Sequence, residues 1–297
     1  MMTPRAVLVH RRTELDELLL HHGTWQQAAF FLRTRNRDIE EVERRHAMQE
    51  AAMRTASASI PVEWRRVQVE RGDLARFGFG VEDVVVAVGQ DGLVANVAKY
   101  LTGQPVIGLN PDVERNPGVL VRHAPEAAKD LLMVAASTAI SSRVEARVMV
   151  EATLDDGQRL TALNEIYVGH PSHQSARYRI TAGEGQLERQ SSSGVLVGTG
   201  TGSTGWCRSV ALERHSTLVL PTPEQARLCW FVREAWPSPA TGTELTEGLL
   251  DMPQRLEISA ESDLVLFGDG IESDSISLTW GQSVSVGIAK QRLHLVT

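Results

Sequence analysis

The chain has 297 residues, of which 42% are hydrophobic, so it is long enough for two domains and can bury a sizeable core. Its 30 basic and 37 acidic residues give a formal net charge of −7, which excludes wholesale nucleic-acid binding because no overall positive field attracts phosphate backbones. With only two cysteines, Cys207 and Cys229, and no apolar run near the roughly 18 residues that span a bilayer, we expect a cytoplasmic protein without a membrane partner.

The first part of the chain alternates short apolar segments with helical ones. Strands are predicted at residues 6–9, 62–69, 84–88 and 105–109, and the run VVVAV at 84–88 suits a strand buried on both faces. One or two amphipathic helices are predicted within residues 25–56, and another from 93 to about 101. Alternation of this kind predicts a parallel sheet with helices on its faces, which we assign as an α/β domain over residues 1–125.

The pattern of predicted elements changes after residue 125. One connecting helix is predicted at 126–136, and β-type segments separated by turn signals follow it. These segments span residues 143–152, 160–168, 177–180, 194–197, 228–233, 256–259, 264–267 and 283–288. The pattern predicts a second, β-rich domain over residues 126–297.

A glycine-bounded turn follows the buried strand at 84–88. Gly89-Gln90-Asp91-Gly92 stands where an open α/β sheet binds ligands, beyond the carboxyl end of a strand. The glycines let backbone amides approach a phosphate, and Asp91 is a candidate to accept a proton from an attacking hydroxyl. Taken alone, the motif is explained better by a tight turn with Asp91 as the N-cap of the next helix.

The richest segment in glycine and hydroxyl groups is GTGTGSTG at residues 198–205, before a helix predicted to end near His215. Four glycines and four hydroxyl residues in eight positions expose many donors to phosphates, a ribose or an adenine edge. Gly200, Gly202 and Gly205 form a G-x-G-x-x-G, but its place in the β-rich part disfavours a Rossmann dinucleotide site. A plain glycine- and serine-rich loop is the alternative.

Three weaker signals lie nearby in the second domain. The pair Asn164-Glu165 combines an amide with a carboxylate and can hold ribose hydroxyls, although such a pair at a strand start is ordinary. Asp269, between Gly268 and Gly270, is by itself a routine turn signal. His170 and His173 have the spacing of a metal-ligand pair but lack further ligands, so a solvated loop explains them better and no protein-ligated metal is expected.

Taken together, these segments resemble the ATP-NAD kinase family, and most closely its mitochondrial-type branch. The segments that match are VVVAVGQDGLVANVAKYL, PVIGLNPDVERNPGVL, ALNEIYVGHPSHQSARYRI, SSSGVLVGTGTGSTGW and GDG followed by a final pair of strands. Their order and spacing agree over nearly the whole chain. The resemblance implies an N-terminal α/β domain, a C-terminal β-sandwich domain and an active site between the two.

The resemblance also implies a role for each matching residue. Asp91 is the catalytic aspartate that accepts the proton of the adenosine ribose 2′-hydroxyl, and Gly89, Gln90 and Gly92 lie against the phosphates of the nucleotide. Several residues of the β-rich domain surround the dinucleotide and its phosphates: Asn164, Glu165, Thr201, Gly202, Ser203, Thr204, Gly205 and Asp269. Asn110 lines the nicotinamide side.

The expected function is therefore NAD kinase activity, with NAD and ATP as substrates, Mg²⁺ accompanying ATP, and assembly as a homodimer or larger homo-oligomer. The sequence departs from the family pattern at Gln90, where a second glycine is usual, and at Leu93, where threonine or serine is usual. Two alternatives therefore stay open. One is a kinase of the same fold acting on a nucleoside, sugar or lipid alcohol, and the other is a catalytically impaired nucleotide-binding regulator.

Overall fold

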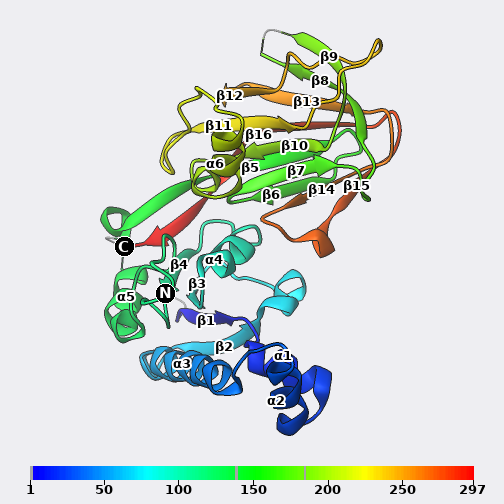
Figure 1. The fold of residues 1–297 in the computed structure, drawn as a ribbon. Helices are drawn as coiled ribbons and strands as arrows, with labels where there is room; N and C mark the ends of the chain where they lie inside the picture. Colours follow the sequence, from blue (N-terminus) through cyan, green and yellow to red (C-terminus); the bar gives the residue numbers. More distant parts are fainter. Residues whose placement is uncertain (1–2, 138–139, 184) are drawn as a thin grey trace. The chain divides into compact units, whose positions relative to one another are not determined.

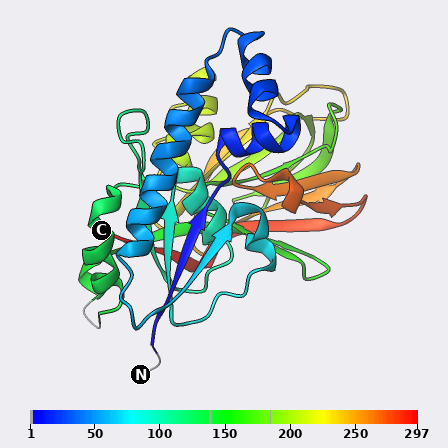
Figure 2. The same cartoon turned by 90° about the horizontal axis from the view of Figure 1, so that it is seen from below.

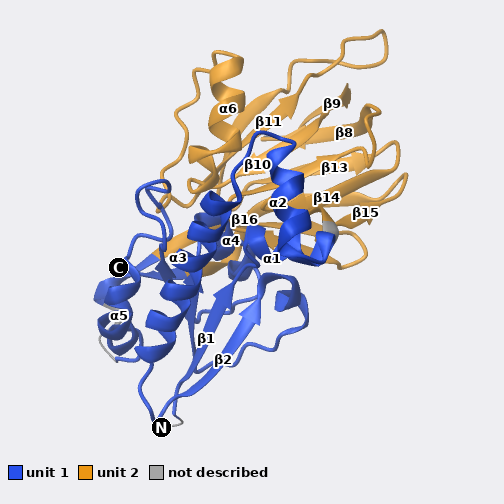
Figure 3. Ribbon diagram, turned by 60° about the horizontal axis from the view of Figure 1, so that its bottom comes forward, with its two compact units in different colours: residues 1–145, 294–297 blue, residues 146–293 orange. Residues whose placement is uncertain are grey.

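The computed structural model describes residues 3–137, 140–183 and 185–297, and these form two compact units (Figure 3). Unit 1 comprises residues 1–145 together with 294–297, and unit 2 comprises residues 146–293. The strands of unit 1 form a parallel sheet, whereas those of unit 2 are antiparallel within the unit. The predicted combination of a parallel α/β sheet with a β-rich C-terminal part is confirmed.

The sheet of unit 1 has the strand order β2-β1-β3-β4 (Figure 1). Its strands are β1 (Arg5–His10), β2 (Arg65–Glu70), β3 (Asp83–Val88) and β4 (Pro105–Leu109). The last residues of β16 (Ser283–Val296), His294 and Leu295, add a further parallel pairing next to β4. Every residue of β3 is buried, as its continuous apolar sequence predicts for a central strand.

Helices lie on the faces of this sheet. The long helix α3 (Ile39–Ala58) lies along the sheet (Figure 2) and packs with α5 (Ala128–Ala135) on the side chains of one face, including Leu8, Val86 and Ile107. Helix α4 (Asp91–Ala98) connects β3 to β4 and contacts both. The chain therefore runs from β1 to β2 in one direction and from β3 to β4 in the other, which makes the carboxyl ends of β1 and β3 the topological switch point.

Two helical features of unit 1 differ from the sequence prediction. A helix that was not predicted, α1 (Glu14–His22), begins at Thr13, whose side chain forms a capping box with Asp16. Helix α2 (Trp25–Arg33) follows it, and these two pack together with α3 around a small core that includes Leu18 and Leu32. Helix α5 belongs to unit 1, although the composition changes near residue 125, because its apolar face packs on α3 and β4.

Unit 2 is a sandwich of two sheets around one core. The first contains β5 (Val144–Leu154), β6 (Arg159–Ala162), β8 (Ala176–Ala182), β9 (Gln186–Ser192), β13 (Arg255–Ala260) and the earlier part of β16. The second has the order β12-β11-β10-β7-β14-β15. Its strands are β12 (Glu247–Asp251), β11 (Arg227–Arg233), β10 (Gly194–Gly198), β7 (Glu165–Gly169), β14 (Leu264–Gly268) and β15 (Ile276–Leu278). Inward-facing side chains from both sheets, such as Ile166 and Ile258, form the largest buried cluster.

The single strand predicted at residues 160–168 is in fact two strands in different sheets. β6 pairs with β5 in one sheet, whereas β7 pairs with β10 and β14 in the other. The chain passes between the sheets at Leu163 and Asn164, whose backbone N–H groups donate to the carboxylate of Asp269 instead of to a neighbouring strand. An apolar pattern that continues across such a crossing does not reveal the break.

Helix α6 (Trp206–Glu213) covers part of the outer face of the six-stranded sheet. Its residues Cys207 and Val210 pack against Leu196, Cys229 and Phe231 of β10 and β11. Both cysteines are buried and free of disulfides. Among the described residues, no helix is both long and apolar enough to cross a membrane.

Candidate functional site

The predicted phosphate turn of unit 1 lies directly after β3. Gln90 is the N-cap of α4 but makes no side-chain capping bond, and Asp91 is the first residue of the helix. The alternative in which Asp91 caps the helix is therefore wrong, because its carboxylate binds elsewhere. Gly89 is half-buried, Gln90 and Gly92 are exposed, and a Cβ added at Gly92 would meet open space. The turn thus leaves backbone open to a ligand.

The carboxylate of Asp91 is held by three consecutive backbone N–H groups. Its Oδ1 accepts from Leu120 at 2.8 Å and from Val121 at 3.0 Å, while Oδ2 accepts from Val119 at 2.9 Å. Hydrogen bonds from main chain hold a side chain without depending on the rotamers of flexible partners. The position of the Asp91 carboxylate is therefore fixed by a segment about thirty residues further along the chain.

Two glycines allow that segment to approach. A Cβ at Gly108, in β4, would overlap the backbone of Leu120 and Val121. Gly118 has a φ of +68°, and a Cβ there would overlap the carbonyl oxygen of Val121. Any other residue at Gly118 is strained both by this backbone conformation and by the overlap. The two glycines are therefore a structural requirement of the Asp91 site.

Asn110 organises the loop that leads to this segment. Its side chain is buried, with Nδ2 donating to the carbonyl of Asn116 at 2.6 Å and Oδ1 accepting from the N–H of Asp112 at 3.0 Å. Only 2% of the residue is exposed. Asn110 therefore shapes the loop, and its placement on the nicotinamide side remains a prediction.

Three of the predicted residues of unit 2 meet where β6 gives way to β7. Asp269, in the turn after β14, accepts from the N–H of Asn164 at 2.6 Å and of Leu163 at 3.0 Å. Its own N–H donates to the carbonyl of Glu165 at 3.0 Å, and its φ of +53° is held by this network. Asp269 thus holds the Asn164-Glu165 segment in place.

Glu165 is a half-buried carboxyl group beside a second carboxyl group. Burial, and then the negative charge of Asp269, raise the pKa of Glu165 from its usual 4.5 to about 7. A carboxyl group that changes its charge near neutral pH can either donate or accept a hydrogen bond there. This property distinguishes Glu165 from an ordinary surface glutamate.

The hydrogen bonds of Thr199 hold the glycine-rich loop in its conformation. Its hydroxyl donates to the carbonyl of Leu163 at 2.6 Å and accepts from the N–H groups of Thr201 at 3.1 Å and Gly202 at 3.2 Å. Its own N–H donates to the carbonyl of Asn164 at 2.8 Å. The loop that joins β10 to the short helix at Gly202–Thr204 therefore lies directly against the Asn164-Glu165 segment.

The hydroxyl groups in this loop are not equivalent. Ser203 donates to the carbonyl of Thr199 at 3.0 Å, and Thr204 donates to the carbonyl of Thr201 at 3.0 Å. The hydroxyl of Thr201, in contrast, is buried without a hydrogen-bond partner, although the residue is only 4% exposed. A buried hydroxyl without a partner is costly, and this distinguishes Thr201 from the other hydroxyl groups of the loop.

Close packing requires two of the glycines in this loop. A Cβ at Gly202 would overlap the carbonyl of Asn164, and one at Gly200 would overlap the carbonyl of Thr222. Gly205, which ends the short helix, has space for a Cβ. The sequence could not distinguish a glycine that is required by close packing from one that has free space, because both are simply glycines in the pattern.

The structure thus assembles two clusters, one in each unit. Unit 1 contains Gly89, Gln90, Asp91, Gly92 and the loop of Asn110, whereas unit 2 contains Asn164, Glu165, Asp269 and residues 199–205. Sequence reasoning missed the amides of residues 119–121 and the organising role of Thr199. Backbone amides have no side-chain signature, although Gly108 and Gly118 are a signal of a close approach.

His170 lies in the loop that follows β7. Nδ1 of His170 accepts from the N–H of Ser172 at 3.1 Å. Across residues 3–137, 140–183 and 185–297, no group of three or more histidine, cysteine or carboxylate residues is arranged to hold a metal ion.

Comparison with known proteins gives a consistent result. No protein-family model matches the chain. It is 30% identical over 228 residues to the NAD kinase of Symbiobacterium thermophilum, which covers 73% of this chain and 74% of that protein. It is 29% identical over 131 residues to the NAD kinase of Chlorobaculum tepidum, a match that spans only 44% of that protein and 43% of this chain.

Solved structures agree on the fold. An NAD kinase from Archaeoglobus fulgidus, solved in complex with ATP, has a TM-score of 0.59 at 17% identity, with 99% of this chain and 93% of that chain covered. A yeast NADH kinase, solved with NADH, has a TM-score of 0.60 at 15% identity and coverages of 100% and 84%. At these identities the likeness concerns the fold.

Proposed function

Because the chain belongs to the NAD kinase family, we propose that it transfers the terminal phosphoryl group of ATP to the adenosine ribose 2′-hydroxyl of NAD, giving NADP. The observation that carries the proposal is the carboxylate of Asp91, which three backbone N–H groups hold at the carboxyl end of β3. A fixed carboxylate next to an exposed turn has the arrangement that general-base catalysis of phosphoryl transfer needs.

The proposed step is an in-line displacement. The 2′-oxygen of NAD attacks the γ-phosphorus of ATP, the bond from that phosphorus to the β–γ bridging oxygen breaks, and ADP leaves. The proton of the attacking hydroxyl passes to the carboxylate of Asp91. Oδ2 of Asp91 accepts one hydrogen bond, from the N–H of Val119, whereas Oδ1 accepts from the N–H groups of Val119, Leu120 and Val121. Oδ2 is therefore the oxygen with the greater remaining capacity to accept that proton.

The cluster in unit 2 is proposed to bind the dinucleotide. Asn164 and Glu165 hold ribose hydroxyls, since an amide and a carboxylate together supply both donors and acceptors. The hydroxyl of Thr201, which has no partner in the protein, donates a hydrogen bond to a phosphate oxygen. Gly202, Ser203, Thr204 and Gly205 line the dinucleotide, and Asp269 keeps the Asn164-Glu165 segment in register with them.

Magnesium is proposed to enter with ATP. Mg²⁺ is usually held by one or two carboxylates together with substrate phosphates, and the exposed turn beside Asp91 fits such a limited protein contribution. When bound, the ion neutralises charge that develops on the transferred phosphoryl group. Homo-oligomeric assembly likewise remains a proposal.

The test is the formation of NADP by the purified protein with ATP, magnesium and NAD. Turnover would support the proposal. Binding of NAD or ATP without NADP formation would instead favour the impaired regulator, in which exposed Gln90 obstructs the donor phosphates. Turnover only with another alcohol would favour the kinase of different acceptor specificity, so nucleosides, sugars and NADH are assayed in parallel.

A further inference from the structure

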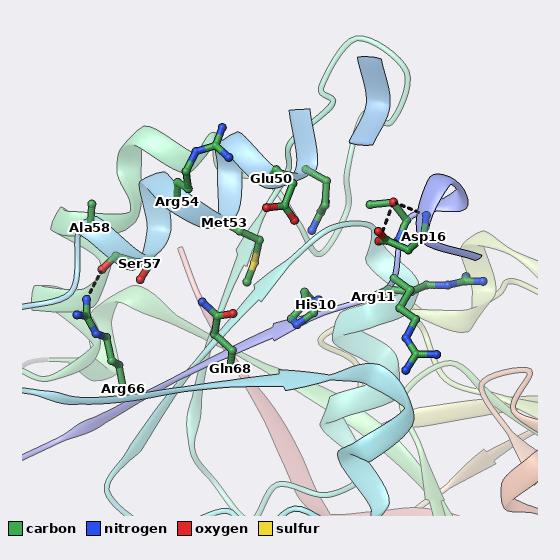
Figure 4. Close-up of a pocket in the computed structure, with 13 residues that line it drawn as sticks. His10, Arg11, Asp16, Glu50, Met53, Arg54, Ser57, Ala58, Arg66 and Gln68 are labelled. Atoms are coloured by element: carbon green, nitrogen blue, oxygen red, sulfur yellow. Dashed lines mark hydrogen bonds between the residues drawn. The ribbon is translucent and has the colours of Figure 1, made fainter. Parts of the chain in front are cut away.

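Two cavities of unit 1 differ in the charge of the side chains that line them. One, of about 410 Å³, lies between α3 and the strands β1 and β2, and it is lined by charges of both signs, including Arg54 and Glu50 (Figure 4). The other has a volume of about 600 Å³ and is lined by α1, α2 and the two residues that follow α2. We call it the hairpin cavity, and none of the described residues that line it is a carboxylate.

One face of α2 forms the wall of the hairpin cavity. Residues four apart are neighbours on a helix surface, and the lining residues follow this spacing in two adjacent rows. The rows are Gln26, Phe30 and Thr34, and Gln27, Phe31 and Arg35. The buried residues of α2 are others, because Ala28, Ala29 and Leu32 pack into the small core with α1 and α3. That core therefore does not require the ring of Phe30.

Aromatic and imidazole rings give the cavity an apolar surface. The side chain of Phe30 is 67% exposed, although phenylalanine is among the residues most often buried. At the end of α1, the ring centroid of His22 lies 4.3 Å from that of Phe31 and 4.8 Å from that of His21. Aromatic rings stabilise one another by offset stacking and by edge-to-face contact, so this group of rings favours a ligand that is itself a flat ring.

Arg35 supplies a cation whose orientation is set within the protein. Its Nη1 donates to the carbonyl of Phe31 and to the hydroxyl of Thr34, both at 3.2 Å, and its guanidinium carbon lies 3.7 Å from the ring centroid of Phe31. Within the part of the chain that the structure describes, Arg35 makes no ion pair, and its Nε and Nη2 donate no hydrogen bond. Two parallel N–H groups on one edge of a guanidinium match the two oxygens of a carboxylate.

Other polar groups of the cavity also lack partners. Gln26 and Gln27 are exposed, and their side-chain amides bond to none of the described residues. Nε2 of His22 is buried without a hydrogen-bond partner, an arrangement that proteins rarely leave uncompensated. Small-molecule sites are lined in the same way, by apolar and aromatic side chains with a few polar groups that fix the orientation of the ligand.

We infer that the hairpin cavity binds a small aromatic carboxylate. The ring of the ligand lies against Phe30 and its neighbouring rings, and the carboxylate pairs with the edge of Arg35 that carries Nε and Nη2. A volume of about 600 Å³ is that of a site for a small molecule. In a chain with a net charge of −7, a cavity lined by an arginine without a carboxylate favours an anion. This binding does not depend on the proposed function.

The experiment titrates the intact chain with three matched probes and measures their binding by calorimetry. Phenylacetate has both a ring and a charge, phenylacetamide lacks the charge, and cyclohexylacetate lacks the aromatic ring. Phenylacetate is expected to bind about tenfold more tightly than phenylacetamide, because only the carboxylate forms charged hydrogen bonds with Arg35. Cyclohexylacetate is expected to bind severalfold more weakly than phenylacetate, because it cannot stack on the rings of the cavity.

Three variants test the residues that carry the inference. Arg35→Gln should weaken phenylacetate binding about tenfold and change phenylacetamide binding much less, and Arg35→Lys should restore part of the loss because it keeps the charge without the fork of donors. Phe30→Ala removes an exposed ring, so it should weaken phenylacetate binding severalfold without lowering the melting temperature. The matched control is Arg33→Gln, which removes an exposed arginine of the same helix outside the cavity and should bind all probes like the wild type.

Equal affinity for phenylacetate and phenylacetamide, or equal losses in Arg35→Gln and Arg33→Gln, would overturn the inference. The same conclusion would follow if the wild type bound none of the three probes. If, in that case, Phe30→Ala also dissociated an oligomer in analytical ultracentrifugation, this face of α2 would be a contact between copies of the chain instead.

Discussion

Oδ1 of Asp91 lies 2.8 Å from the backbone nitrogen of Leu120, and this hydrogen bond joins the start of α4 to a loop that is remote in sequence. The carboxylate proposed to accept a proton is therefore oriented by main chain rather than by a charged side chain. A change in the loop should disturb the reaction without touching Asp91 itself.

Replacement of Asp91 by asparagine is expected to lower kcat for NADP formation about 10²- to 10⁴-fold, the usual contribution of a general base. The amide keeps the size of the side chain and one acceptor oxygen for the N–H groups of residues 119–121. Affinity for NAD, measured by calorimetry, should be unchanged. A kcat within a few fold of the wild type would remove Asp91 from the proposed mechanism.

The variant Gly118→Ala is expected to lose both stability and turnover. Its φ of +68° and the overlap with the carbonyl of Val121 predict a cost of about 1–3 kcal/mol and a displaced loop. Thermal unfolding and kcat report the two effects. In Gly78→Ala, the matched control, the added Cβ meets nothing within 4 Å, so stability should change by less than about 0.5 kcal/mol. Equal behaviour of the two variants would contradict the role given to Gly118.

Two threonines in one loop should respond oppositely to replacement by valine. In Thr201→Val the lost hydroxyl had no partner, so the melting temperature should be unchanged or higher, while affinity for NAD falls about tenfold. In Thr199→Val the lost hydroxyl had bonded Leu163, Thr201 and Gly202, so the free energy of unfolding should fall by about 2 kcal/mol or more. Retention of full NAD affinity by Thr201→Val would show that its hydroxyl does not contact the ligand.

Glu165 predicts a pH dependence of stability with a definite sign. Because its pKa is raised from 4.5 to about 7 in the folded chain, the folded state binds more protons than the unfolded state between these values, and stability falls as pH rises through 7. The displacement corresponds to at most about 3 kcal/mol.

The variant Glu165→Gln removes this penalty. It should be more stable than the wild type at pH 8 but not at pH 4, as measured by denaturant unfolding at both pH values. Glu224→Gln, which changes an exposed carboxyl group of the same unit, is the control and should show no such pH-dependent gain. A constant difference between Glu165→Gln and the wild type across this range would mean that burial of Glu165 has no effect on its titration.

The elements set by local pattern were predictable. The apolar run at 84–88 fixed the buried strand β3, and the alternation of elements around it gave the parallel sheet. Helix α1 was missed because it is short and its stability comes from packing on α2 and α3 rather than from a long apolar period. Strands β9, β12 and β15 were missed because their polar or short sequences are determined by their partners.

The candidate site shows the same division. Asp91, Asn164, Glu165 and Thr201 were identified because side chains carry their chemistry in the sequence. Two facts could be learned only from the structure: how the backbone donors are divided between the two oxygens of Asp91, and which hydroxyl of the glycine-rich loop is left without a partner. The assignment to the mitochondrial-type branch and the roles of individual residues toward NAD remain predictions.

The pairing of β16 with β4 has a consequence for synthesis of the chain. His294 and Leu295 lie beside Pro105 and Val106, so this edge of the parallel sheet is completed only after residues 146–293 have been translated. A nascent chain therefore exposes the backbone of β4 while the sandwich is still emerging from the ribosome. The N-terminal unit, although it is made first, reaches its final form last.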